Sequence, residues 1–192
     1  MILFWDIDGT LLTTARAGIH AWENALAEVA GSRADLSGFD TAGVPDHQIA
    51  QRLLREVGGA PDAPGQVDRL VGRYEDLLPA ALGRRQGRVL PNVREILERI
   101  ERQPELRSRL LTGNTRRGAE AKLRHYGLDR FFRDGGAFSD RLCQRDDIAL
   151  AAVEAARVDG WTPAAGAVVI GDTPHDIRCG RLVGARTLAV AT

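Results

Sequence analysis

The hydrophobic pattern of this 192-residue chain is a series of short apolar runs separated by longer segments of helical periodicity. Residues 1–5 are almost wholly apolar and predict a short buried strand, and 167–171 form the continuous apolar run typical of a strand buried on both faces of a parallel sheet. Further strands are expected at 108–112, 135–138 and 186–190. Helices are expected at 92–102, 115–126, 146–158 and 175–183. This alternation predicts an α/β fold with a doubly wound parallel sheet.

Residues 15–88 interrupt the alternation, because they contain no strand-like run. Apolar residues such as Ile19, Trp22 and Leu26 recur there at three- and four-residue spacing, which is the spacing of one helix face. Three helices are expected, at 16–30, 46–57 and 65–83, with glycine and proline in the breaks between them. We therefore predict a core of residues 1–14 and 89–192 and an inserted all-helical domain of residues 15–88.

Composition narrows the choice of partners and location. Lys+Arg and Asp+Glu number 26 each, so the net charge is zero and no overall field attracts nucleic acid or an acidic membrane. The two cysteines, Cys143 and Cys179, are isolated, which suits a reducing compartment. The N-terminus has no signal-like segment, and no apolar run approaches the roughly 18–20 residues that span a membrane. We expect a cytoplasmic protein, either monomer or homodimer, with neither nucleic acid nor a membrane as partner.

Two carboxylates, Asp6 and Asp8, follow the first predicted strand directly. On an extended chain they share one face, where they repel each other unless a cation or a shared proton lies between them. Gly9 permits a sharp turn immediately afterwards. Solvated acids at a strand end are the alternative for a bare D-x-D pattern. The full run, a buried strand followed by D-x-D-G-T-L, is far more specific.

Polar residues also follow two other predicted strands. The residues concerned are Thr112, Gly113 and Asn114 after one strand, and Asp172 and Asp176 after another. Each group taken alone is commonly a helix N-cap. In an open parallel sheet, however, ligands bind where the carboxyl ends of the strands meet. Together with Lys122, which lies between them in the sequence, these residues predict one site.

The order of these motifs resembles that of the haloacid dehalogenase-like (HAD) hydrolases. Asp6 and Asp8 resemble the first motif, Thr112 the second and residues 171–176 the fourth. The insertion is similar in position to the helical C1-type cap of the phosphoglycolate phosphatase-like members. The resemblance covers nearly the whole chain and implies a HAD-like Rossmannoid core with an all-helical cap. Related proteins usually continue with another helix and strand, so a chain truncated at Thr192 is one expectation.

The resemblance implies a phosphomonoester hydrolase that depends on Mg²⁺ and forms an aspartyl-phosphate intermediate. Asp6 would attack phosphorus, and Asp8 would act first as the acid and then as the base. Mg²⁺ would be held by Asp6, the main-chain carbonyl of Asp8 and Asp172. The groups that would hold the phosphoryl oxygens belong to Thr112, Gly113, Asn114 and Lys122.

The third family motif, a cation near the nucleophile, has two candidates in this chain. Lys122 is the only lysine among the 26 basic residues, and it lies roughly 10 Å along its helix with its side chain leaning toward the site. Arg145 lies in the region where many members carry lysine. Alternatively, Arg145 is a surface residue that pairs with Asp146 or Asp147. Asp176 is expected to position Lys122 or the metal shell.

The cap is expected to select the substrate, a small phosphorylated metabolite of the phosphoglycolate kind. Residues 41–46 resemble the cap loop that faces the active site of related phosphatases, or else form an ordinary loop with Asp46 as a helix N-cap. Most of the cap arginines are expected to be solvated, and any that bind a second anionic group would come from Arg16, Arg52, Arg55, Arg69, Arg73, Arg84 and Arg85. A sugar phosphomutase of the β-phosphoglucomutase type is one alternative. A regulatory protein that binds phosphate without turnover is another, although the acid at Asp8 argues against it.

Overall fold

A parallel five-stranded sheet forms the centre of the computed structural model, which describes residues 1–140, 142 and 144–191. The strands lie in the order β5-β4-β1-β6-β7. Their bounds are β1 Ile2–Trp5, β4 Arg107–Leu111, β5 Gly136–Ala137, β6 Ala167–Gly171 and β7 Arg186–Ala189. Trp5 of the central strand β1 is in register with Leu110 of β4 on one side and Ile170 of β6 on the other. The predicted α/β fold with a parallel sheet is therefore confirmed.

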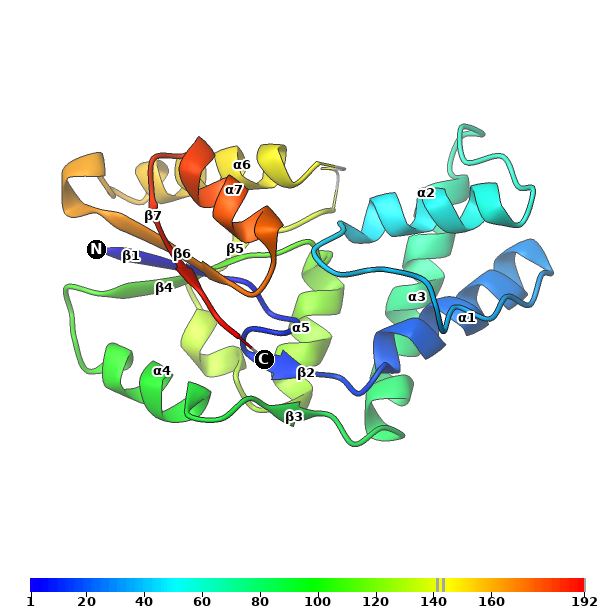
Figure 1. The fold of residues 1–192 in the computed structure, drawn as a ribbon, viewed down its shortest axis with the longest axis horizontal. Helices are drawn as coiled ribbons and strands as arrows, with labels where there is room; N and C mark the ends of the chain where they lie inside the picture. Colours follow the sequence, from blue (N-terminus) through cyan, green and yellow to red (C-terminus); the bar gives the residue numbers. More distant parts are fainter. Residues whose placement is uncertain (141, 143, 192) are drawn as a thin grey trace.

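Helices cover both faces of this sheet (Figure 1). One face carries α4 Val93–Glu101 and α5 Arg116–His125, and the other carries α6 Arg145–Val158 and α7 Pro174–Leu182. Short 3₁₀ turns lie at Asp129–Phe132 and Pro163–Ala165. Leu3 of β1 belongs to the same core as Leu123 of α5, whereas the adjacent Phe4 belongs to the core that includes Ile148 of α6. Because both faces of β1 are covered, its sequence is apolar without alternation.

The inserted segment consists of three helices, α1 Ala17–Ala30, α2 Asp46–Glu56 and α3 Gln66–Gly83. They gather at one side of the sheet and enclose a hydrophobic core of their own (Figure 1). Trp22 of α1 and Tyr74 of α3 stack within this core, with ring centroids 3.9 Å apart and the planes 2° from parallel. We call this segment the cap; its exact limits, at residues 15 and 88, stay a prediction.

The two chain crossings between core and cap run side by side. β2 Leu12–Thr13 and β3 Arg88–Val89 form an antiparallel pair, in which Leu12 is in register with Val89. The hydrophobic pattern does not predict this pair, because two residues are too few to show a period. The pairing ties both linkers to each other at the base of the cap.

The cap also contacts the core directly, through α3 and α5. Arg117 of α5 donates hydrogen bonds to Glu75 Oε2 at 2.9 Å and Asp76 Oδ1 at 2.8 Å, both on α3. A Cβ atom at Gly118 would lie 3.8 Å from the ring of Tyr74, so the two helices approach closely at this glycine. The cap therefore rests on the same helix that carries Lys122.

Within the described residues, no helix combines the length and the apolar character that a membrane span requires. The cytoplasmic location and the oligomeric state stay predictions.

Two helical glycines give a matched test of how tightly α7 packs on the sheet. A Cβ atom at Gly180 of α7 would overlap the methyl group of Thr187, whereas a Cβ atom at Gly72 of α3 would meet nothing within 4 Å. Gly180→Ala should therefore lower the free energy of unfolding by about 1–3 kcal/mol. Gly72→Ala should raise it by roughly 0.5–1 kcal/mol, because alanine favours the helix. Urea unfolding of both variants measures this, and equal effects would contradict the packing described.

Candidate active site

The carboxyl ends of β1, β4 and β6 meet at one edge of the sheet and bring the predicted motifs together. Asp6 follows β1, Thr112 follows β4 and Asp172 follows β6. Gly9, at a φ of 79°, turns the chain beneath them. A side chain at this position would overlap the carboxylate of Asp172, so the turn requires glycine for space as well as for conformation.

Three carboxylates form the centre of this edge. Oxygen atoms of Asp6, Asp172 and Asp176 lie within 4.8 Å of one another. Burial raises the pKa of Asp6 to about 7; the Arg145 guanidinium opposes this shift, and the charges of Asp176 and Asp8 add to it. Burial also raises the pKa of Asp172. Such crowded oxygen donors with an excess of negative charge fit a hard divalent cation such as Mg²⁺.

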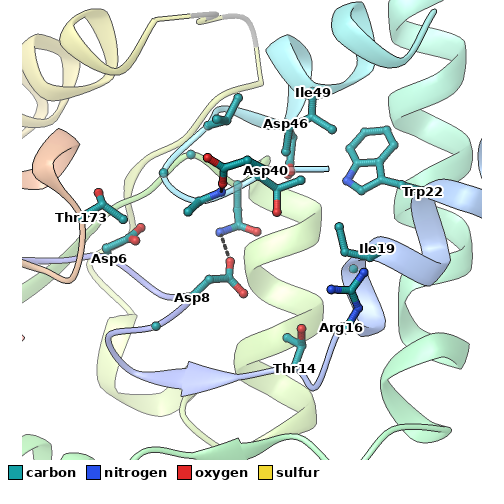
Figure 2. Close-up of a pocket in the computed structure, with 18 of the residues that line it drawn as sticks. Asp6, Asp8, Thr14, Arg16, Ile19, Trp22, Asp40, Asp46, Ile49 and Thr173 are labelled. Atoms are coloured by element: carbon teal, nitrogen blue, oxygen red, sulfur yellow. Dashed lines mark hydrogen bonds between the residues drawn. The ribbon is translucent and has the colours of Figure 1, made fainter. Parts of the chain in front are cut away.

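The Asp8 carboxylate faces away from this trio, toward Lys122. Lys122 Nζ donates hydrogen bonds of 2.6 Å to Asp8 Oδ2 and 2.6 Å to Asn114 Oδ1. Asn114 Nδ2 in turn donates to Asp8 Oδ2 at 2.9 Å, the bond drawn in Figure 2, and to Thr112 Oγ1 at 2.8 Å. Lys122 is only 4% exposed, so its side chain reaches from α5 into the site. A role of Asp8 at a metal would accordingly fall to its main-chain carbonyl.

Arg145 provides a second buried cation, on the opposite side of Asp6. It is 2% exposed, forms an ion pair with Asp176 and places Nη1 3.6 Å from Asp6 Oδ1. The alternative interpretation of Arg145 as a surface residue paired with Asp146 or Asp147 is therefore wrong. Its partners, Asp6 and Asp176, are distant in the sequence, so the acids that follow Arg145 directly are not the ones it binds.

Asp176 contacts Arg145 and not Lys122, contrary to one of the two expectations for it. Asp176 Oδ2 also accepts hydrogen bonds from the main-chain N–H and the hydroxyl of Thr173, at 3.0 and 2.7 Å. These bonds fix its carboxylate at the start of α7. Cys143, one of the two isolated cysteines, lies outside the described residues.

The cap loop, residues 41–46, closes over this edge of the sheet. Gly43 has a φ of 66°, and a Cβ atom there would lie 2.7 Å from the ring of His175 and 2.9 Å from Thr173 Oγ1. At the end of the loop, the Asp46 N–H donates to Gly113 O at 2.8 Å. The loop thus touches the core segments after both β4 and β6.

Asp46 does not cap its own helix, contrary to one expectation from the sequence. Pro45 is the N-cap of α2, and Asp46 Oδ2 instead accepts a hydrogen bond of 2.8 Å from the Thr115 N–H, at the start of α5. Asp46 is 5% exposed, and burial raises its pKa to about 7, opposed by the Lys122 ammonium and the Thr115 N–H. The partner lies 69 residues away, so no local signal could have revealed it.

Cap and core together enclose a cavity of about 370 Å³. Its core side includes Asp6, Asp8, Asp172, Lys122 and Arg145, and its cap side includes Arg16, Trp22, Asp40, Asp46 and Tyr74. Figure 2 shows Asp6 and Asp8 across the cavity from Arg16 and Trp22. Of the seven cap arginines, only Arg16 borders the cavity as the structure describes it. Trp22, Asp40 and Tyr74 were not singled out from the sequence, because their patterns are those of ordinary helix and loop residues.

Comparison with known proteins identifies the family. The family model described as haloacid dehalogenase-like hydrolase matches residues 3–181. The chain belongs to the haloacid dehalogenase-like hydrolases. The resemblance to this family is thereby confirmed, and the protein is an enzyme of the hydrolase type. A search of the curated proteins gives no match.

Solved structures show the same HAD fold. CbbY from Rhodobacter sphaeroides in complex with phosphate has a TM-score of 0.81 at 19% identity, covering 100% of this chain and 86% of that one. A candidate phosphoglycolate phosphatase from Lactobacillus plantarum has a TM-score of 0.63 at 22% identity, covering 97% and 84%. A candidate β-phosphoglucomutase from Thermotoga maritima has a TM-score of 0.61 at 21% identity, covering 100% and 85%.

The raised pKa of Asp46 predicts a pH-dependent contribution to stability. Between about pH 4 and pH 7, the folded chain keeps a proton on Asp46 that the unfolded chain releases, so this contribution falls as pH rises. The asparagine side chain of the Asp46→Asn variant does not ionise in this pH range. The difference in unfolding free energy between the wild type and Asp46→Asn should therefore decrease by roughly 1–4 kcal/mol from pH 4.5 to 8.

Chemical denaturation at several pH values measures this difference. Lys122, Asp8, Tyr74 and Glu75 surround Asp46 in both proteins, so their own titrations largely cancel. Asp62→Asn, an exposed cap acid that does not border the cavity, is the control. A difference that does not change with pH would show that Asp46 is ionised throughout.

Proposed function

We propose that this HAD hydrolase is a Mg²⁺-dependent phosphatase that hydrolyses a small phosphorylated metabolite through an aspartyl-phosphate on Asp6. The observation that carries the proposal is the opposite placement of two neighbouring carboxylates. Asp6 lies with Asp172 and Asp176, next to Arg145, whereas Asp8 is held by Lys122 and Asn114. This arrangement supports a nucleophilic role for Asp6 and a proton-transfer role for Asp8.

The reaction takes two steps. In the first, an Asp6 oxygen attacks phosphorus, the bond from phosphorus to the ester oxygen breaks, and Asp8 gives its proton to the departing alkoxide. In the second, Asp8 takes a proton from water, whose oxygen attacks phosphorus and releases phosphate from Asp6. Lys122 and Asn114 fix the Asp8 carboxylate by hydrogen bonds, which orients it for both transfers.

The residues that would hold Mg²⁺ are Asp6 and Asp172 with their carboxylates and Asp8 with its main-chain carbonyl. When bound there, the ion would neutralise charge on the phosphoryl oxygens and reduce the repulsion between the phosphate and these acids. Asp176 lies within the same trio of carboxylates, but its ion pair with Arg145 and its bonds to Thr173 favour a supporting role.

Two cations, Arg145 and Lys122, bind the phosphoryl group from opposite sides. Arg145 lies beside the nucleophile, and its buried Nη1 has no hydrogen-bond partner in the described part of the chain. We therefore place Arg145 in the role of the third motif, beside a phosphoryl oxygen. Lys122, together with Thr112, Gly113 and Asn114, lines the other side of the phosphate position and keeps Asp8 oriented.

The structural neighbours support phosphoryl chemistry on a small molecule. A mutant of the CbbY neighbour has also been solved in complex with xylulose-(1,5)bisphosphate, at a TM-score of 0.80 and 18% identity to this chain. The neighbour from Thermotoga maritima favours a second candidate, a sugar phosphomutase. Phosphate release compared with isomer interconversion on sugar phosphates separates the two candidates.

Asp6→Asn should abolish the nucleophile with little change in volume. With p-nitrophenyl phosphate and Mg²⁺, we expect turnover to fall by about 10³-fold or more. Chelation of the metal should suppress the wild-type activity, and added Mg²⁺ should restore it. Asp62→Asn, which changes an exposed acid outside the cavity, is the matched control. Turnover of Asp6→Asn close to the wild-type value would rule out this mechanism.

Lys122→Arg should show that the site requires an ammonium. The guanidinium is too wide to lie between Asp8 Oδ2 and Asn114 Oδ1, each 2.6 Å from Nζ. We expect kcat to fall at least about tenfold although the charge is kept. Arg124→Lys, an exposed exchange on the same helix, should leave kcat unchanged. Equal kcat values for wild type and Lys122→Arg would mean that only the charge matters.

A further inference from the structure

Two buried side chains on the cap side of the cavity carry a polar group that has no hydrogen-bond partner among the described residues. Trp22 is 2% exposed and Tyr74 is 1% exposed, and both border the cavity. No hydrogen bond to the Trp22 indole N–H or the Tyr74 hydroxyl is found among residues 1–140, 142 and 144–191, and neither atom is among the fully enclosed unpartnered ones, so both are open to the cavity. Buried Trp and Tyr side chains normally satisfy these groups, since leaving them unpaired costs free energy. A ligand in the cavity is therefore a natural partner for them.

The orientation of Trp22 agrees with this. Figure 2 shows its indole ring across the cavity from Asp6, with the nitrogen on the edge of the ring that faces Asp40 and Asp8. The stacking on Tyr74 fixes the plane of the ring. The N–H therefore points to the space that the leaving group would occupy when its phosphate lies at Asp6.

Charges on the cap side are unfavourable for an anion. Asp40 borders the cavity there as a charged carboxylate, and Asp46, whose pKa burial raises to about 7, also borders it. The only cap cation that borders it in the described chain is Arg16, which is exposed and whose Nη2 already donates to Leu36 O and Ser37 O at 3.4 and 3.2 Å. Asp40 is exposed as well, and its Oδ1 accepts a hydrogen bond of 3.0 Å from the Ala42 N–H, which restricts the rotation of the carboxylate.

We propose that the cap side of the cavity binds a neutral, hydroxyl-bearing leaving group, the polyol or sugar part of a phosphate monoester, and selects against a second anionic group. A hydroxyl can accept from the Trp22 N–H and donate to the Asp40 carboxylate at once. A carboxylate or a phosphate dianion can only accept, and it would face the Asp40 carboxylate with one solvated arginine as the compensating charge. The cavity of about 370 Å³ lies near the lower end of the range for small-molecule sites, which suits a leaving group of few carbons.

This inference rests on the proposed phosphatase function and narrows its substrate class. Matched esters test it, because each pair differs only by a CH₂OH group in place of a carboxylate. The pairs are 2-hydroxyethyl phosphate with 2-phosphoglycolate, and glycerol 1-phosphate with 3-phosphoglycerate. We expect kcat/KM to be at least about tenfold higher for the alcohol of each pair. Fructose 6-phosphate should likewise be preferred to fructose 1,6-bisphosphate.

Two variants test which residues select the alcohol over the acid. Asp40→Asn should raise kcat/KM for the carboxylates and so lower the ratio of kcat/KM for the alcohol to kcat/KM for the acid. Trp22→Phe keeps an aromatic ring on Tyr74 but removes the N–H, and should raise KM for the alcohols by about fivefold or more. Asp62→Asn removes the same charge away from the cavity and should leave the ratio unchanged. A ratio that Asp40→Asn does not move would overturn the role given to Asp40.

The failure of this inference is distinguishable from the failure of the phosphatase proposal. If the enzyme hydrolyses p-nitrophenyl phosphate and prefers the carboxylates or treats each pair equally, the substrate class is wrong and the phosphatase function stands. If it hydrolyses no phosphomonoester with Mg²⁺ present, both proposals fall together.

Discussion

Repulsion among buried carboxylates is the constraint on which the catalytic edge of the sheet depends. Asp6, Asp172 and Asp176 crowd together with Asp8 close by, and without compensation their burial would favour protonation. The chain compensates with one cation on each side, Arg145 next to Asp6 and Lys122 next to Asp8. The three carboxylates themselves keep an excess of negative charge, which fits a divalent cation.

The cap is held against the core at the same edge of the sheet. The loop ending at Asp46 binds the first turn of α5, and α3 packs against that helix through Arg117 and Gly118. Since α5 also carries Lys122, the helix that contacts the cap is the helix that orients Asp8. The position of the cap is thus coupled through direct contacts to Asp8, the proposed acid-base group.

The sequence was sufficient for the fold and for the motifs that follow its strands. The reason is that buried parallel strands have a distinct apolar pattern and their carboxyl ends must meet. It was not sufficient for Arg145, which looks like a surface residue because Asp146 and Asp147 follow it, although its partners are Asp6 and Asp176. Contacts between residues distant in the chain leave no local pattern.

The same limit explains the other differences. Asp46 has the composition of a helix N-cap, yet it binds the N–H of a different helix, 69 residues away. The unpaired groups of Trp22 and Tyr74 sit on positions whose periodicity indicates only a helix face. The roles of the individual site residues therefore stay predictions, whereas their convergence is a property of the fold.

A practical consequence follows from Lys122 being the only lysine of the chain. Amine-directed acylating reagents meet a single ε-amino group here, and it lies 4% exposed at the floor of the cavity between Asp8 and Asn114. The rate at which that amine is labelled is thus a direct gauge of solvent access beneath the cap, free of the background that surface lysines give in most proteins.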